Sequence, residues 1–420
     1  MEWIHKPAVE SLMALLNGLL ATVTQGFQIN LPSWMAYPLM LLCTIGFIAV
    51  SALILIWGER KISARIQMRL GPMMTGSKYM AQKSMWLGGW LQSPADAIKL
   101  LTKELIVPSK ADPFPFVLAP IIIVAVCICA FVVLPFAPAL SVSDLNIGIV
   151  HIVAISSLTV LSILMAGWSS NNKYSLLGGL RSAAQMLSYE IPLIFSLLGP
   201  ILLAGTLSMQ GIVAAQREMG LWFGIPSFLG LVIYYISSIA EVNRPPFDIP
   251  EAESELVAGY VSEYSGMMFS MFFLAEFANM FLVCAVAATV FLGGWMVPFV
   301  PLPDHPTLLY TLAGLAVFLT KTSVLVLIMM WIRWTFPRVR PDHLMNLGWK
   351  YLFPLALLNL MLCATVCILR EEFQLNSWAV AAFSVGALVL VLVLFQLITR
   401  PKPHGMPGMP GMPPVAVPAE

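Results

Sequence analysis

The chain has 420 residues, of which 59% are hydrophobic and only 10% are charged, with a formal net charge of +1. An ordinary soluble domain carries roughly 25% charged residues, so a cytosolic enzyme, a nucleic-acid binder and a disordered chain are excluded. The apolar runs are continuous, not alternating, and about 20 residues long, which predicts membrane-spanning helices and not a β-barrel.

The predicted fold is an all-α polytopic membrane protein with about nine transmembrane helices. Each predicted span is long enough to cross the ~30 Å hydrocarbon core. The nine spans are 36–57, 115–135, 148–168, 187–206, 222–241, 268–291, 308–332, 351–369 and 376–398.

The two ends of the chain differ from this membrane domain, 36–398. Within the N-terminal segment 1–35, residues 8–29 have Leu and Val at helical spacing on one face and Asn and Thr on the other. This pattern predicts an interfacial amphipathic helix, with a tenth span as the alternative. The tail 399–420 repeats Met-Pro-Gly, and its Pro and Gly prevent a packed core, so disorder is predicted.

The basic residues predict the orientation. Most of the 22 Lys and Arg residues fall in connections that the predicted spans place on one side, namely 58–114, 169–186, 242–267, 333–350 and the tail. The other side holds Lys6, Arg217 and Arg370. Because cytoplasmic loops carry the excess of Lys and Arg, we expect the N-terminus outside and the C-terminus in the cytoplasm.

Cysteine and histidine give no sign of a redox centre. All six Cys lie within predicted spans and none forms a CxxC pair, which is typical of small apolar core residues. The five His do not pair inside the membrane. We therefore expect no metal, flavin, haem or iron–sulfur cluster on this chain. If the protein serves redox chemistry, its electrons would travel on another subunit.

Acidic residues gather in and around the connection 242–267. They are Glu241, Asp248, Glu251, Glu253, Glu255 and Glu263, and Glu276 lies inside the span that follows the connection. Glu190 lies at the end of the earlier span 187–206. The predicted topology puts Glu190, Glu241 and Glu276 in the cytoplasmic half of the membrane. There a carboxylate must face a cavity, pair with a cation or hold a proton, and neighbouring carboxylates raise one another's pKa.

Two interpretations of these acids remain open. They either transfer protons, or pair with basic groups and merely orient helices. Because Arg244 is the one basic residue of the connection, we expect too few partners and favour proton transfer. Lys321, in the middle of a later span, is a further charge that calls for a function.

The connection 58–114 is basic and amphipathic. Its opening, 58–72, places Arg60, Lys61, Arg65 and Arg69 at helical spacing, where they can meet lipid phosphates. From Pro94 a second helix is predicted, with an apolar face opposite Asp96, Lys99 and Lys103. This helix either anchors the connection on the membrane surface or docks a peripheral partner.

These same stretches carry a resemblance to a known family. EVNRPPFDIPEAESELVAGYVSEYSG (241–266) is similar to the long cytoplasmic loop of the H-type membrane subunits of bacterial NADH:quinone oxidoreductase (complex I), whose mitochondrial counterpart is membrane-arm subunit 1. Further matches follow in chain order: ERKISARIQMRLGP (59–72), LQSPADAIKLLTKE (91–104), SYEIPL (188–193), FFLAEFANM (272–280) and WIRWTFPRVRPDHLMNLGWK (331–350).

The resemblance implies a translocase subunit of the bacterial inner membrane that closes the quinone-binding cavity and couples quinone reduction to proton translocation. It implies quinone as the substrate of a shared site, and as partners the peripheral iron–sulfur and quinone-site subunits, small membrane subunits, antiporter-like subunits and membrane lipid. The proton path would comprise Glu190, Glu241, Asp248, Glu251, Glu253, Glu255, Glu276 and Lys321. The quinone cavity or the docking of the peripheral arm would involve Glu59, Arg60, Lys61, Arg65, Arg69, Asp96, Lys99 and Lys103.

Three alternatives remain. The homologous subunit of a membrane-bound hydrogenase or formate hydrogenlyase reduces no quinone, and the stretch 253–255 (ESE) together with 59–61 (ERK) favours the quinone version. A stand-alone secondary transporter is less favoured, because the two halves of the chain show no internal repeat. A purely structural anchor is disfavoured by Glu276 and Lys321, since charge within lipid is costly.

Overall fold

The computed structural model describes residues 33–73, 75, 88–138, 140–250, 253–297, 308–373, 382, 384 and 386. The expected helix 8–29, residues 77–86, most of the expected span 376–398 and the tail 399–420 lie outside them. Within the described residues the regular elements are all helices and no β-strand occurs. The all-α prediction is confirmed.

Seven helical segments are long and apolar enough to cross a membrane among the described residues. They are built from α2 (Ser33–Ile66), α5 (Pro113–Phe131), α6 (Gly148–Ser156) with α7 (Leu158–Ser169), α8 (Lys173–Ala204), α12 (Gly266–Val290), α13 (Leu308–Thr335), and α14 (Pro341–Asn346) continuing through the π-helix Leu347–Leu352 into α15 (Phe353–Phe373). These segments correspond to seven of the nine predicted spans, so the fold is that of a polytopic membrane protein.

The span predicted at 222–241 is shorter than expected. Only α10 (Phe228–Glu241) is helical there, because turns that include Pro226 occupy the preceding residues. Fourteen residues rise only about 21 Å, less than the hydrocarbon thickness. Helix α10 alone is therefore too short to cross the core, and Glu241 is its last residue.

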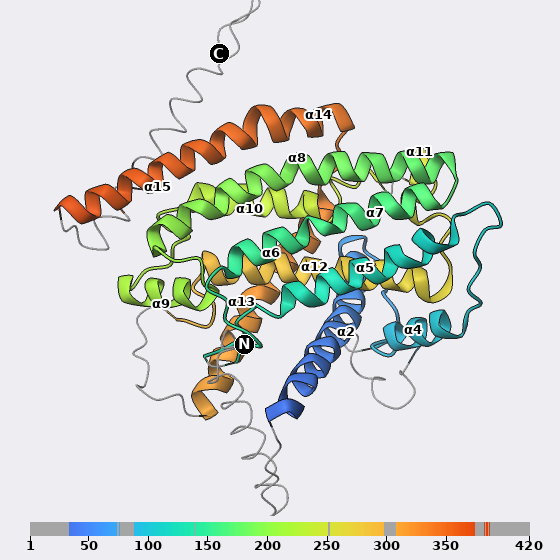
Figure 1. Ribbon diagram of the computed structural model, residues 1–420, viewed down its shortest axis with the longest axis horizontal. Helices are drawn as coiled ribbons and strands as arrows, with labels where there is room; N and C mark the ends of the chain where they lie inside the picture. Colours follow the sequence, from blue (N-terminus) through green and yellow to red (C-terminus); the bar gives the residue numbers. More distant parts are fainter. Residues whose placement is uncertain are drawn as a thin grey trace, which may run out of the picture.

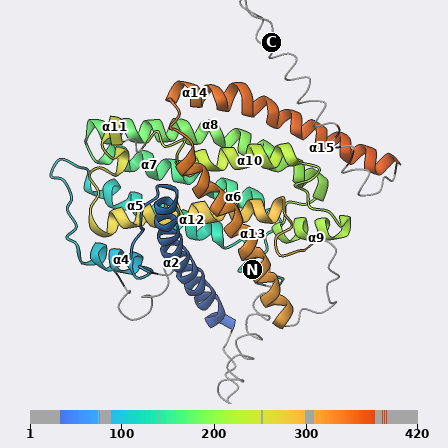
Figure 2. The same ribbon diagram turned by 180° about the vertical axis from the view of Figure 1, so that it is seen from behind.

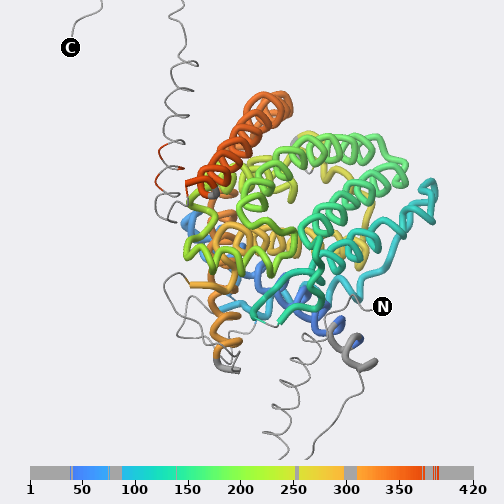
Figure 3. The backbone as a smooth tube through the Cα atoms, turned by 60° about the vertical axis from the view of Figure 1, so that its left-hand side comes forward, coloured from blue at the N-terminus to red at the C-terminus, as the bar shows by residue number. Residues whose placement is uncertain are grey.

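The helices lie in layers around α8. Figure 1 shows α14 and α15 along one edge, with α8, α10 and α7 beneath them, and α2 and α13 crossing below α12. The view from behind shows α2 and α13 on the same side of α12 (Figure 2). The tube in Figure 3 shows the α6–α7 and α8 segments following one another round an arc. The buried side chains between the layers are mainly Ala, Val, Phe, Leu and Ile.

Glycine allows α7 and α8 to approach closely. A methyl group at Gly167 on α7 would lie 3.2 Å from the Cα of Gly179 on α8, and 2.9 Å from the carbonyl oxygen of Ser175. Both distances are below an ordinary van der Waals contact. Since small residues let helix backbones meet where lipid supplies no hydrophobic drive for association, this pair keeps the α7 face beside α8.

The span 148–169 is broken in its middle. Helix α6 ends at Ser156 and α7 begins at Leu158. The hydroxyls of Ser156 and Ser157 donate to the carbonyls of Val153 and Ala154, both at 2.9 Å. Side-chain hydroxyls thus satisfy backbone acceptors at the break, which is what permits an interrupted helix at membrane depth.

Three shorter helices complete the described bundle. Helix α4 (Gln92–Thr102) lies in the first basic connection, and α9 (Met209–Met219) precedes α10. The acidic connection contains α11 (Glu253–Leu256) and a 3-10 turn, Gly259–Val261. The helix predicted from Pro94 is confirmed, with Pro94 in its first turn.

Candidate functional site

A large, half-open cavity of about 1250 Å³ lies between α2, α4, α12 and α13. One part of its wall is apolar, with Leu53 and Ile56 on α2 and Phe269, Phe273 and Phe277 on α12. The other part is charged and comprises Glu59, Arg60, Asp96, Lys99, Arg244, Asp248, Glu276, Arg333 and Arg338. A cavity with these two walls suits a ligand that has an apolar body and a polar head.

Four of these side chains form an alternating row of charges, which we call the charge row: Glu276, Arg244, Glu59 and Arg333. The guanidinium of Arg244 lies 2.8 Å from Glu276 and 3.1 Å from Glu59, and Arg333 contacts the same Glu59 carboxylate. The Arg244 side chain is 4% exposed and that of Glu59 is 9% exposed. Two acids and two guanidiniums balance, which offsets the cost of burying each charge.

The fold places Arg244 in this row through α8. Gln185, buried on α8, donates to the carbonyls of Ala240 at 2.8 Å and Phe247 at 2.7 Å, which fixes both ends of the short turn carrying Arg244. Asn243 in that turn has a φ of 54°, a conformation that Asn tolerates better than most residues. The ring of Phe277 lies 4.3 Å from the guanidinium carbon of Arg244 and provides a cation–π contact.

Two further ion pairs lie at the rim of the cavity. Arg60 at the end of α2 contacts Asp96 of α4 at 2.6 Å, and Arg338 beyond α13 contacts Asp248 at 2.7 Å. Gln92 also donates to Asp96, at 3.1 Å. These contacts attach α4 to α2 and the acidic connection to the end of α13. Since their arginines are more exposed, each pair adds little stability by itself.

The expectation that Arg244 would be the one base near the acids is wrong. Arg333 and Arg338 reach the acids from α13 and the segment after it, and Arg181 of α8 pairs with Glu255 at 2.6 Å. These partners are 74 or more residues away in the sequence. A count of bases within the acidic connection therefore missed them, and the interpretation that acids pair with bases holds for Glu59, Asp248, Glu255 and Glu276.

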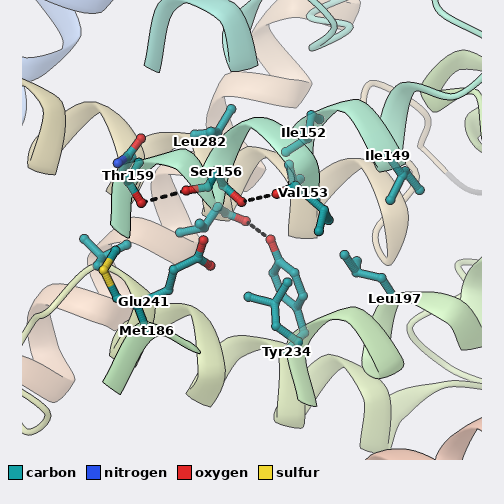
Figure 4. A pocket seen from close by; sticks show the side chains of 15 residues that line it. Ile149, Ile152, Val153, Ser156, Thr159, Met186, Leu197, Tyr234, Glu241 and Leu282 are labelled. Carbon is teal, nitrogen blue, oxygen red and sulfur yellow. Dashed lines mark hydrogen bonds between the residues drawn. The ribbon is translucent and has the colours of Figure 1, made fainter. Parts of the chain in front are cut away.

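A second, enclosed chamber of about 40 Å³ lies between the α6–α7 break, α8, α10 and α12. It has room for water, which needs roughly 15 Å³ per molecule. Glu241 projects into it toward Ser156, while the hydroxyl of Tyr234 donates to Val283 (Figure 4). Glu190 lies close enough to act electrostatically on Glu241. Among the described residues no cation lies within ion-pair distance of Glu241.

Helix α12 forms the wall between the cavity and the chamber. Glu276 lines the cavity, and Asn279, three residues further on, lines the chamber. Residues three apart on a helix are neighbours, so the cavity and the chamber come within one turn of α12 of each other. No role in the site was predicted from the sequence for Asn279, Arg181, Arg333 or Arg338. Two of the stretches that resemble the family, 272–280 and 331–350, contain Asn279, Arg333 and Arg338, and this was the available signal for them.

The other predicted residues lie apart from both spaces. Lys321 donates to the carbonyls of Leu292, Gly294 and Met296, and its position on α13 is about 18 Å along the helix from Arg333. Lys61 donates to the sulfur of Met73. Arg65, Arg69 and Lys103 are exposed, and none of these four basic residues is among the described residues that line the cavity. Glu251 and the side chain of Glu253 lie outside the described residues.

The far end of the acidic connection is anchored by Tyr264. Its hydroxyl donates to the carbonyl of Phe116 at 3.1 Å, and its ring stacks on that of Phe116 with centroids 4.1 Å apart. Burial raises the pKa of Tyr264 to about 12, so the hydroxyl remains a donor at neutral pH. The connection is thus fixed at both ends, by Gln185 and by Tyr264.

The described residues contain no group of three or more His, Cys, Asp or Glu that could hold a metal ion. The chemistry visible in this part of the chain is instead that of paired charges facing a cavity and of acids facing an enclosed chamber. Together the fold and the site define a polytopic helical membrane protein with a cavity that has one apolar and one charged wall.

Comparison with known proteins gives the family. The NADH dehydrogenase family model matches residues 39–364, and the chain belongs to this family. The H subunit of an NADH-quinone oxidoreductase from Brevibacillus brevis is 45% identical over 342 residues, covering 80% of this chain and 95% of the relative. The relative of the same name from Phocaeicola vulgatus is 45% identical over 336 residues (79% and 90%). NADH-quinone oxidoreductase subunit 8 from Rhodothermus marinus is 45% identical over 345 residues (79% and 98%).

Proposed function

We propose that this chain is the membrane subunit of a proton-pumping NADH:quinone oxidoreductase that closes the quinone-binding cavity and couples quinone reduction to proton translocation. The observation that supports this most directly is the cavity with one apolar wall and one charged wall. A quinone has an apolar isoprenoid tail and a ring with two carbonyl acceptors, which match the two walls. Family membership and relatives of 45% identity support the same function.

The open side of the cavity fits a shared site. The chain contributes one apolar and one charged wall to this site. We infer that the peripheral iron–sulfur and quinone-site subunits cover the open side and deliver electrons there. Small membrane subunits and antiporter-like subunits would then contact the lateral faces, with lipid on the remainder.

Coupling would start at the charge row. Reduction of a quinone next to Arg244 and Arg333 adds negative charge, which competes with Glu59 and Glu276 for the two guanidiniums. A carboxylate that loses its guanidinium has a higher proton affinity. Such differential interaction with the oxidised and reduced ligand is what coupling requires.

The change would then pass through α12. Glu276 lies one helical turn from Asn279, which shares the enclosed chamber with Glu241, and Glu190 acts on Glu241 electrostatically. Protons could pass between these acids by way of water in the chamber, because carboxylates can both accept and release them. Glu255, exposed and paired with Arg181, and Asp248, paired with Arg338, would tune the charge at the cavity side.

The test is a pair of variants in the assembled complex. Glu276→Gln and Glu241→Gln preserve shape but cannot carry a proton, so we expect NADH-driven acidification of proteoliposomes to fall strongly while subunit composition is unchanged. Glu263→Gln is the matched control, because Glu263 bonds to Asn172 at the far end of the connection. Normal proton pumping and normal quinone reduction in both assembled variants would rule out the path.

The hydrogenase alternative makes a different prediction for the purified assembly. The quinone proposal requires that NADH oxidation be linked to reduction of a short-chain quinone, with iron–sulfur subunits present. An assembly that evolves hydrogen and ignores quinone would support the alternative. The orientation, with the acidic and basic connections in the cytoplasm of a bacterial inner membrane, is part of this proposal.

A further inference from the structure

The end of α12 opposite the cavity has a structure that the proposed proton path does not use. After Val290 the chain forms a non-helical segment, 291–297, which we call the α12 turn. Phe291 is fully buried and Met296 is 4% exposed. Irregular backbone at membrane depth persists only where protein or water satisfies its polar groups, so the partners of its carbonyls identify what fills this end.

Protein groups satisfy every carbonyl from residue 287 to residue 294. Backbone N–H groups donate to four of these carbonyls, at 2.7–3.0 Å. Phe291 donates to Ala287, Gly294 to Ala288, Gly224 to Phe291 and Met296 to Gly293. The side-chain amide of Gln216 on α9 is fully buried and donates to the carbonyls of Thr289 at 3.0 Å and Val290 at 3.1 Å. No carbonyl in this run depends on water.

Lys321 is the donor to the remaining two carbonyls of this run, those of Leu292 and Gly294. Its ammonium donates to the carbonyls of Leu292 at 2.6 Å, Gly294 at 2.9 Å and Met296 at 2.5 Å. Gly293 and Gly294 have φ of +74° and +55°, a conformation that glycine adopts readily and that lets three carbonyls converge on one ammonium. All three N–H donors of the lysine are therefore in use, and the ring of Trp222 lies 4.9 Å away.

An aromatic layer lies beside the α12 turn. It consists of Phe47, Phe131, Phe136, Phe281 and Phe318, whose neighbouring rings have centroids 5.0–6.3 Å apart. Phe318 is fully buried and precedes Lys321 by three residues, so the layer and the ammonium are neighbours on α13. Closely packed apolar rings, here mostly edge-to-face, exclude water.

We propose that Lys321, Gln216 and the aromatic layer form a dry seal that closes the end of the bundle opposite the quinone cavity to protons. This inference rests on the proposed function, because a proton-pumping subunit must not leak between its acidic chamber and the far side. A proton leaving Glu241 is thereby restricted to lateral exit toward a neighbouring subunit. Lys321 then acts as a positioning residue of the barrier and not as a proton carrier.

The seal is tested by passive leak in proteoliposomes of the assembled complex without NADH. An imposed pH gradient is followed with a trapped pH-sensitive dye. Lys321→Met and Gln216→Met remove donors, so water must enter to satisfy the freed carbonyls, and we expect the gradient to decay several-fold faster. Lys350→Met, a change at an exposed lysine, is the matched control and should decay like the unmodified complex. NADH:quinone turnover measured with an uncoupler should be retained in Gln216→Met and Lys350→Met.

A pH gradient that decays at the unmodified rate in both assembled variants would refute the proposed seal. So would a tight Lys321→Met complex that has lost NADH-driven acidification, because that result would make Lys321 part of the proton relay. If Lys321→Met does not assemble, Gln216→Met and Phe47→Ala decide the question with the lysine in place. Because leak is measured without turnover, an unmodified complex that failed to reduce quinone would refute the proposed function while the leak comparison still stood.

Discussion

Arg244 bridges two acids that no other described cation could hold together. Its guanidinium contacts both Glu59 and Glu276, whereas Arg333 contacts Glu59 alone. Removing Arg244 would thus leave Glu59 with a partner and Glu276 without one. A planar guanidinium reaches two carboxylates at once, and a lysine ammonium offers a single point of charge.

Replacement of Arg244 should therefore depend on what happens to Glu276. Arg244→Met leaves Glu276, whose side chain is 16% exposed, without its cation. A fully buried carboxylate in this position would cost about 3–5 kcal/mol, so we expect a loss below that range and a lower melting temperature of the complex. Adding Glu276→Leu removes the unpaired carboxylate and should recover most of the lost stability, although quinone reduction stays impaired. Thermal unfolding of both purified variants measures this, and a double variant less stable than Arg244→Met would show that the pair is not the source of the loss.

At the scale of elements, local hydropathy predicted the helices but not their pairing. The free energy of transfer into lipid is a property of each run alone, so the apolar runs placed the seven described spanning segments. The break between Ser156 and Leu158 and the late start of α10 have weak local signals. The ion partners of Glu255 and Asp248, Arg181 and Arg338, depend on which helices become neighbours, and a single sequence does not contain that information.

Asn279 on α12 offers a prediction at this scale, because it is the polar residue of the chamber wall one turn from Glu276. Asn279→Leu replaces a hydrogen-bonding amide with an apolar group, so water between the two spaces loses a partner. We expect acidification per NADH oxidised to fall while the rate measured with an uncoupler is affected less. Asn279→Asp keeps a polar group and should retain more coupling. Equal coupling in the Leu and Asp variants would mean that α12 carries no polar link at this position.

The whole molecule has an asymmetry that can be read as an orientation. Helix α4, which contributes to the charged cavity, and α11 of the acidic connection lie toward one end, while α9 lies toward the other (Figure 1). Lys173 begins α8 next to Asn172, which donates to Glu263 of the acidic connection, and the exposed Arg217 lies in α9. Basic residues are retained on the cytoplasmic side, so the cavity should open there, where peripheral subunits can reach it. The dry seal would then face outward, which is the side from which protons must not return.

A cysteine at each end distinguishes the two orientations. In a chain whose native cysteines are replaced by Ala, Lys173→Cys should react with a membrane-impermeant maleimide in inside-out vesicles, and Arg217→Cys should react in right-side-out vesicles. Both positions are exposed, so the substitutions should leave assembly intact, which co-purification of the other subunits checks. The reverse labelling pattern would put the cavity outside, and peripheral subunits in the cytoplasm could not then cover it.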